Sequence, residues 1–234
     1  MKIGSIFSGA GIGDLGFTWA GFDHSWFCEI DEYARKVLSL RWPGIQIYKD
    51  VTELKGNELP AIEILIGGFP CQAFSSAARG RNIADKDRKA ELVRLADEMR
   101  PRWVVGENVK RSPVESVAAD LRGLGYRTSV FNLKSAQVGA DHQRSRWWVC
   151  AYADNEGEFH LPINAEVARL SKIRRSFRGW PDYARAVRAS SESSNRVHRL
   201  ECLGNGQDPF VTLAIGRAIR KVETTFSKSV GNNG

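Results

Sequence analysis

Short apolar runs alternate with longer segments of helical periodicity along most of the chain. The strand-like runs cover residues 2–7, 25–29, 45–48, 62–66, 103–106, 127–133 and 147–152. Apolar residues recur at helical spacing over about residues 13–20, 31–41, 88–100, 113–124 and 209–223. Strands that alternate with helices are typical of βαβ units. The pattern therefore predicts an α/β fold with a doubly wound, mostly parallel sheet.

One polar segment interrupts this alternation. From Asn155 to about Arg199 the chain is basic and rich in serine, with little apolar periodicity. We interpret residues 155–195 as a short basic insertion. Residues 1–154 and 196–234 then form one domain, in which the last helix returns to the sheet.

Composition limits the class of protein. With 234 residues, of which 42% are hydrophobic, the chain has material for one good core. The formal charge of +7 favours a polyanionic partner. Four widely spaced cysteines without metal-ligand spacing predict reduced thiols in a cytoplasmic protein and no metal site. We expect no membrane span and no signal peptide, because no apolar stretch has the required length.

Two candidate reactive groups follow neighbouring strand-like runs. Cys71 comes after Pro70 at the end of the run 62–66, and Glu107 follows the run 103–106. Active sites of open α/β sheets lie at the carboxyl ends of strands, so a nucleophile and a proton donor would converge there. The competing interpretation is that Cys71 is a small buried hydrophobic residue, the usual fate of a free cysteine.

A glycine-rich turn follows the first strand-like run. Phe7, Ser8, Gly9 and Gly11 stand between this strand and a helix, where glycines let a ligand approach the backbone. Glu29 and Asp50 end the second and third runs, and could accept from ribose hydroxyls and an adenine amino group. They could also simply cap the following helices. Three such groups at successive strand ends predict a nucleoside-containing cofactor, and the missing Lys-Ser/Thr pair disfavours ATP hydrolysis.

In chain order, these motifs resemble those of the C5-cytosine DNA methyltransferase family, particularly its compact phage and prophage forms. The matching segments are Phe7–Gly11, Glu29, Asp50–Val51, Gly67–Ser75, Glu107–Val109, His142–Arg146 and Leu203–Gly206. The resemblance implies a Rossmann-like catalytic domain that uses S-adenosylmethionine (SAM). It implies cofactor contacts from Phe7, Ser8, Gly9, Gly11, Glu29, Ile30, Asp50, Val51, Pro70, Asn205 and Gly206.

The resemblance also assigns catalytic roles. Cys71 would add to C6 of a cytosine flipped out of duplex DNA, and Glu107 would hydrogen-bond or protonate N3. Arg144 and Arg146 would address the cytosine carbonyl oxygen, the thiolate and a nearby phosphate. An apolar strand end would raise the pKa of Glu107, which suits a proton donor.

DNA contacts are expected from two basic segments. The predicted residues are Gln72, Ser75, Arg79 and Arg81 after the cysteine, and Arg174, Arg175 and Arg178 in the insertion. A solvated basic face is the competing interpretation. The expected partner is double-stranded DNA, and the short insertion suggests that a second subunit or a homo-oligomer supplies target recognition.

Three alternatives remain open at this stage. The same chemistry could act on RNA such as tRNA, whose flipped loop bases need less recognition apparatus. The chain could be a catalytically degenerate or partner-dependent DNA-binding module. It could also transfer a modified group to C5 from a relative of SAM. Asp141 and Asp208 depart from the family pattern, which leaves details of cofactor binding open.

Overall fold

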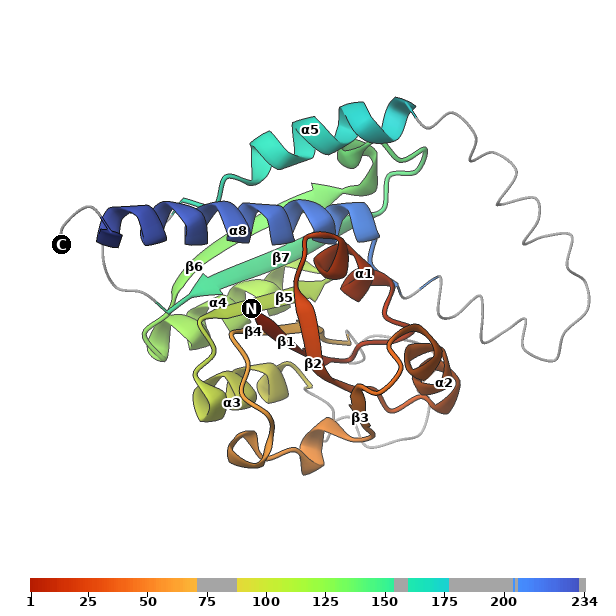
Figure 1. The fold of residues 1–234 in the computed structure, drawn as a ribbon, viewed down its shortest axis with the longest axis vertical. Helices are drawn as coiled ribbons and strands as arrows, with labels where there is room; N and C mark the ends of the chain where they lie inside the picture. Colours follow the sequence, from red (N-terminus) through yellow and green to blue (C-terminus); the bar gives the residue numbers. More distant parts are fainter. Residues whose placement is uncertain (71–87, 154–159, 177–203, 205, 232–234) are drawn as a thin grey trace, which may run out of the picture.

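A seven-stranded mixed sheet forms the centre of the protein, in the order β3-β2-β1-β4-β5-β7-β6 (Figure 1). The computed structural model describes residues 1–70, 88–153, 160–176, 204 and 206–231. The strands are β1 Lys2–Ile6, β2 Asp23–Cys28, β3 Gln46–Tyr48, β4 Ile64–Gly68, β5 Trp103–Asn108, β6 Arg127–Lys134 and β7 Ser145–Tyr152. Within this sheet β7 alone runs antiparallel to its neighbours β5 and β6. The predicted doubly wound, mostly parallel α/β fold is confirmed.

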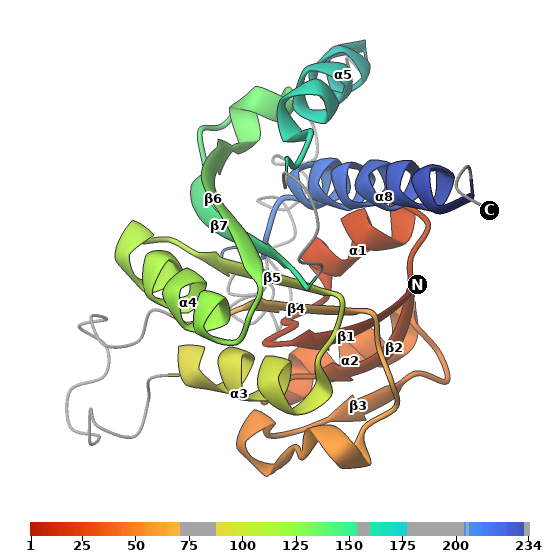
Figure 2. The same ribbon diagram turned by 90° about the vertical axis from the view of Figure 1, so that its left-hand side faces the viewer.

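Helices cover both faces of the sheet. Helices α1, α5 and α8 lie on one face, and α3 and α4 lie on the other (Figure 2). Their bounds are α1 Ile12–Trp19, α2 Glu32–Arg41, α3 Lys89–Met99, α4 Arg111–Gly123, α5 Ile163–Ser176 and α8 Pro209–Gly231. Short 3₁₀ helices are η1 Val51–Glu53, η2 Gly56–Glu58 and η5 Ser135–Val138. Because each face of the sheet is covered, its central strands β4 and β5 are buried along almost their whole length.

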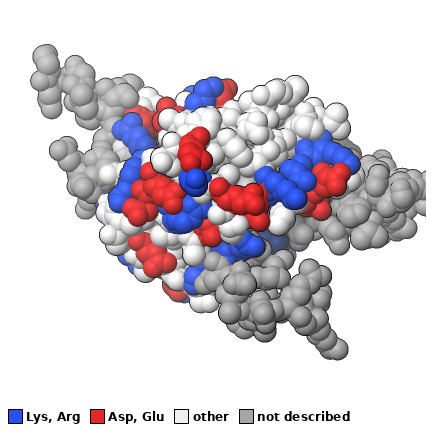
Figure 3. Space-filling view, turned by 90° about the horizontal axis from the view of Figure 1, so that it is seen from below, with Lys and Arg blue, Asp and Glu red and all other residues white. Residues whose placement is uncertain are grey.

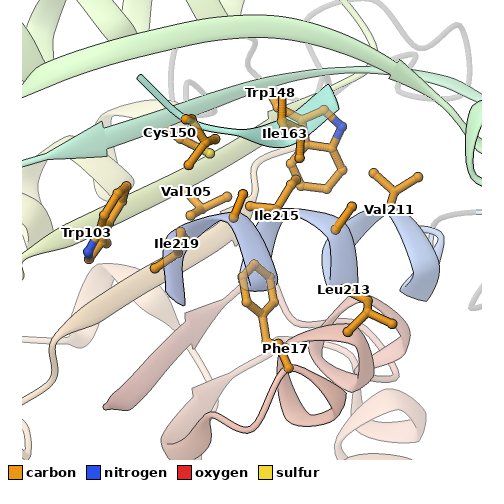
Figure 4. Close-up of a cluster of buried hydrophobic side chains, with 14 of the residues drawn as sticks. Phe17, Trp103, Val105, Trp148, Cys150, Ile163, Val211, Leu213, Ile215 and Ile219 are labelled. Atoms are coloured by element: carbon orange, nitrogen blue, oxygen red, sulfur yellow. The ribbon is translucent and has the colours of Figure 1, made fainter. Parts of the chain in front are cut away.

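The larger of the two hydrophobic clusters joins α1, α5 and α8 to the sheet. Phe17 of α1 and Ile215 of α8 are buried there with Trp148 and Cys150 of β7 (Figure 4). The opposite cluster packs side chains of α3 and α4, such as Leu92 and Leu121, against the other face. Both clusters contact β4, β5 and β7, so these strands and the groups at their ends have a rigid support.

Helix α5 is the main element that the apolar pattern did not predict. It lies in the segment interpreted as an insertion, and its sequence is mostly basic and polar. Only a few positions enter the core: Ile163 and Leu170 are buried in the cluster of α8. Glu166 is also buried, and its Oε1 lies 2.5 Å from Nζ of Lys221 in α8. The described part of the predicted insertion therefore packs on the main core, while the boundaries at 155 and 195 stay a prediction.

Charge is mixed on the face shown in Figure 3. Basic and acidic side chains stand next to one another across the part of it that the structure describes. Arg94 shows the pattern: its guanidinium bonds to Glu91 and Glu98 and to the carbonyls of Val51 and Leu54. Over the described residues, no helix is both long enough and apolar enough to cross a membrane.

Candidate active site

The carboxyl ends of β4 and β5 lie side by side, with Gly68 paired with Glu107. Asn108, the last residue of β5, is buried, and its Nδ2 donates to the carbonyl of Phe69 at 2.9 Å. Its Oδ1 accepts from the backbone N–H of Lys110 at 2.9 Å. Asn108 therefore fixes the backbone that leads through Pro70 to Cys71. Sequence reasoning noted its motif but did not assign it a role.

Several predicted site residues lie outside the described part of the chain. They are Cys71, Gln72, Ser75, Arg79, Arg81, Arg178 and Asn205, and the side chain of Arg175. Their roles remain predictions. What the structure does describe is the strand end from which the segment after Pro70 departs.

Glu107 is a buried carboxyl group with two partners. Nε of Arg146 lies 3.0 Å from its Oε1, and Nε2 of Gln207 donates to its Oε2 at 3.2 Å. Burial raises the pKa of Glu107, while Arg146, the Gln207 hydrogen bond and Arg144 oppose that shift. A carboxyl group with a raised pKa at a strand end is suited to donating a proton.

The two predicted arginines stand at the start of β7 and have different partners. Arg146 pairs directly with Glu107, whereas Nη2 of Arg144 donates to the carbonyl of Gly204 at 2.7 Å. Burial lowers the pKa of the Arg144 guanidinium, and Arg146 acts in the same direction. Arg144 thus connects the strand to the glycine turn before α8, on the same side as Glu107.

The turn after β1 has an unusual backbone. Phe7 has a φ of 54°, and Gly9 and Gly11 have φ values of 53° and 70°. A non-glycine residue in the left-handed region is strained, and such strain clusters at functional sites. Open space surrounds the position where a side chain on Gly9 would stand. The turn therefore leaves its backbone accessible to a ligand.

Glu29 is bound to this turn. Its Oε2 accepts from the N–H of Gly9 at 2.6 Å, and its Oε1 accepts from the N–H of Asp31 at 2.9 Å. Burial raises the pKa of Glu29, and these backbone bonds oppose the shift. The side chain of the next residue, Ile30, is 62% exposed, which is unusual for a large apolar group.

Asp50 and Val51 complete the third strand end. Oδ1 of Asp50 accepts from the N–H and the hydroxyl of Thr52 at 3.0 and 2.8 Å, so Asp50 caps η1. These bonds lower its pKa. Asp31, not Glu29, caps α2 by accepting from the N–H of Ala34. Asp50 thus acts as the helix cap that one interpretation expected. Glu29 does not cap α2 and instead accepts a hydrogen bond from the glycine turn.

A family profile described as C-5 cytosine-specific DNA methylase matches residues 1–201. The chain belongs to this family. Among its relatives, the type II methyltransferase M2.BsuMI of Bacillus subtilis is 31% identical over 160 residues, which are 62% of this chain and 40% of that protein. M.FnuDI of Fusobacterium nucleatum is 30% identical over 185 residues, 74% of this chain and 54% of that one. This member of the family thus spans about half the length of these two relatives.

Solved structures agree with this assignment. A DNA modification methyltransferase encoded within an E. coli prophage aligns with a TM-score of 0.54 and 26% identity, over 65% of this chain and 46% of that one. Dnmt2 of S. pombe aligns with a TM-score of 0.55 and 17% identity, over 68% and 51% of the two chains, and so supports the fold alone. The resemblance stated from the motifs is confirmed at the level of the family.

Arg174 of this DNA methylase family member has partners within the protein. Its Nη1 donates to both carboxylate oxygens of Asp208 at 3.0 Å, and its guanidinium lies over the ring of Phe210. Asp208 also accepts from the N–H of Phe210 at the start of α8. Arg174 therefore fastens α5 to α8, a role different from the DNA contact expected from its charge.

We expect Arg174→Ala to lower the free energy of unfolding by about 3 kcal/mol, because Asp208 would remain buried without its cation. Urea titration of the wild type and the variant measures this difference. Lys172→Ala, an exposed change on the same helix, is the matched control, and we expect it to stay within about 0.5 kcal/mol of the wild type. An equally small change in Arg174→Ala would show that the ion pair does not fasten the helices.

Proposed function

We propose that the protein transfers the methyl group of SAM to C5 of a cytosine in DNA through a covalent adduct on Cys71. The observation that carries this proposal is Glu107, a buried acid with a raised pKa, paired with Arg146 beside the strand end that leads to Cys71. The family supports the same reaction.

The proposed reaction begins at the thiolate. The sulfur of Cys71 forms a bond to C6 of cytosine, and the electron pair displaced from the C5–C6 double bond makes C5 nucleophilic. C5 then takes the methyl group, a base removes the proton from C5, and the S–C6 bond breaks to restore the C5–C6 double bond and the Cys71 thiolate. Any proton that N3 received from Glu107 returns to the carboxylate. SAM would be the methyl donor, and loss of the methyl group would convert its sulfonium into a neutral thioether.

Glu107 supports the addition step in this scheme. Negative charge develops on the ring toward N3 as sulfur adds to C6, and a carboxylic acid beside N3 neutralises it by donating a proton or a hydrogen bond. Arg146 orients the acid through its 3.0 Å contact with Oε1. A cation at this place also stabilises negative charge on the cytosine carbonyl oxygen.

The residues at the ends of β1, β2 and β3 fit a nucleoside cofactor. The open space at Gly9 admits a ligand to the backbone, and the two oxygens of Glu29 have lone pairs beyond those used by Gly9 and Asp31. The exposed side chain of Ile30 offers an apolar surface for a base. SAM, when bound there, supplies an electrophilic methyl group. Phe7, Ser8, Gly11, Asp50, Val51, Pro70 and Gly206 remain the other proposed contacts.

The proposed partner is double-stranded DNA, from which the base must be flipped out of the stack. The proposed location is the cytoplasm, as expected from the reduced thiols. Arg79, Arg81, Arg175 and Arg178 are the proposed phosphate contacts. A second subunit or a second copy of the chain remains the proposed source of target recognition.

Mass spectrometry of nucleosides tests the proposal. A host that lacks cytosine methylation would express the wild type or Cys71→Ser, and we expect 5-methylcytosine in its DNA only with the wild type. A product that persists in Cys71→Ser would contradict the covalent scheme. Methylation of RNA alone, a heavier C5 adduct or the absence of any new base would favour, respectively, the RNA, altered-donor and degenerate alternatives.

A further inference from the structure

Gln207 occupies a slot between two glycines on different elements. A Cβ atom on Gly68, at the end of β4, would lie 2.7 Å from Nε2 of Gln207 and 2.9 Å from Oε2 of Glu107. A Cβ atom on Gly13, in α1, would overlap Oε1 of the same glutamine. Both glycines therefore leave the space that this one side chain fills, so the amide is held in a defined place.

In this slot, the amide of Gln207 lies beside the carboxyl oxygen of Glu107 that Arg146 does not contact. Arg146 stands beside Oε1, and Gln207 donates to Oε2 at 3.2 Å. The two carboxyl oxygens thus have different partners, one charged and one neutral. Neither the family motifs nor the apolar pattern pointed to this contact, which joins residues 100 positions apart.

The segment that carries Gln207 is itself fixed at both sides. The carbonyl of Gly204 accepts from Arg144, and Asp208 is held by Arg174. The hydroxyl of Thr212 donates to the carbonyl of Gly13 at 2.7 Å, which ties α8 to the helix that forms one wall of the slot. The glutamine that contacts Glu107 is therefore held in place by the hydrogen bonds of its neighbours.

We propose that Gln207 is a positioning residue that fixes the carboxyl group of Glu107 for its encounter with the target base. This proposal rests on the proposed function of Glu107 as the acid beside N3. If Arg146 were the only partner, the carboxyl group of Glu107 could rotate so that both oxygens contact the guanidinium. Such a bidentate pair favours the ionised carboxylate. A neutral amide holds the second oxygen without adding a full positive charge.

The sign of the effect on titration follows from the hydrogen bond. A donated N–H favours the carboxylate, so the contact with Gln207 lowers the pKa of Glu107 against the rise caused by burial. Removing the donor should therefore raise that pKa further. If the reaction needs protonated Glu107, the rate falls as the pH rises through this pKa, and the loss should move to higher pH in the variant.

The experiment compares wild type, Gln207→Leu, which keeps the volume and removes the donor, and Gln207→Glu, which keeps the length and adds a like charge. We expect kcat for DNA methylation to fall about tenfold in Gln207→Leu, while KM for SAM and DNA stays within about twofold. The alkaline limb of the kcat–pH profile should move upward in both variants. Gln46→Leu, an exposed change in β3, is the matched control and should behave as the wild type.

A second readout does not depend on turnover. In protein labelled with ¹³C at glutamate carboxyl carbons, the Glu107 signal is the one that Glu107→Gln removes, and its titration midpoint should rise in Gln207→Leu. An unmoved midpoint with normal kcat would overturn the role of Gln207 alone. A wild type that forms no methylated base would overturn the proposed function and the catalytic purpose of the contact, whatever the midpoint does.

Discussion

The Glu107→Gln variant is expected to lose about a thousandfold of the methyl-transfer rate, within the range that a positioned general acid contributes. Glutamine keeps the size of the side chain, but it loses the charge that pairs with Arg146 and has no acidic proton to deliver at N3. Binding of SAM should change little, because the partners of Glu107 are Arg146 and Gln207, neither of which is a proposed cofactor contact. Single-turnover methylation of DNA and calorimetric titration of SAM measure the two effects.

The matched control is Glu115→Gln, an exposed acid paired with Arg111 on α4. We expect it to keep the wild-type rate. A Glu107→Gln variant with the rate of this control would remove Glu107 from the mechanism.

The same substitution should affect stability in a way that depends on pH. Because burial raises the pKa of Glu107 in the folded protein, its contribution to stability is fully present below the unfolded value, near 4.5, and is lost as the pH rises through the folded value. Glutamine does not titrate. The stability of Glu107→Gln relative to the wild type should therefore increase from pH 4 toward pH 8, as measured by denaturant unfolding at both ends.

The second large effect is expected at Gly16, where α1 packs closely on the start of α8. A Cβ atom on Gly16 would overlap the hydroxyl of Thr212 and the carbonyl oxygen of Pro209, and would lie 2.5 Å from the backbone nitrogen of Leu213. Alanine is better than glycine in a helix by about 1 kcal/mol, but backbone atoms cannot move aside as a side-chain end can. We expect Gly16→Ala to destabilise the protein by about 3 kcal/mol.

Urea unfolding tests this sign against Gly123→Ala. Gly123 ends α4, and no atom lies within 4 Å of the position of its Cβ. The control variant should be as stable as the wild type or up to about 1 kcal/mol more stable. If Gly16→Ala also gained stability, the close packing of α1 on α8 would be contradicted.

The strands were predictable because their signal is local. Ile64–Gly68 and Trp103–Asn108 are buried on both faces, so the short apolar runs within 62–66 and 103–106 suffice to locate them. Helix α5 was missed for the opposite reason. Its buried face consists of few residues. One of them is Glu166, whose charge is paired with Lys221 of α8, a helix far away in the sequence. No window of sequence contains that information.

The candidate site shows the same division. Glu107 and its burial follow from the end of an apolar strand, and its raised pKa agrees with the expectation. Its partner Gln207 could not be predicted, since the contact depends on how α8 returns to the sheet. The ion pair of Arg174 with Asp208 could not be predicted either, because charge alone does not distinguish a cation that faces DNA from one that pairs within the protein.

The bond between Thr212 and Gly13 joins positions 199 residues apart, and this distance has a consequence during synthesis. The ribosome makes α1 well before α8, the helix that covers it. Until then the apolar side of α1, with Phe17, has no permanent cover. Glu107 likewise acquires its hydrogen bond from Gln207 only when the segment that leads into α8 has docked on α1.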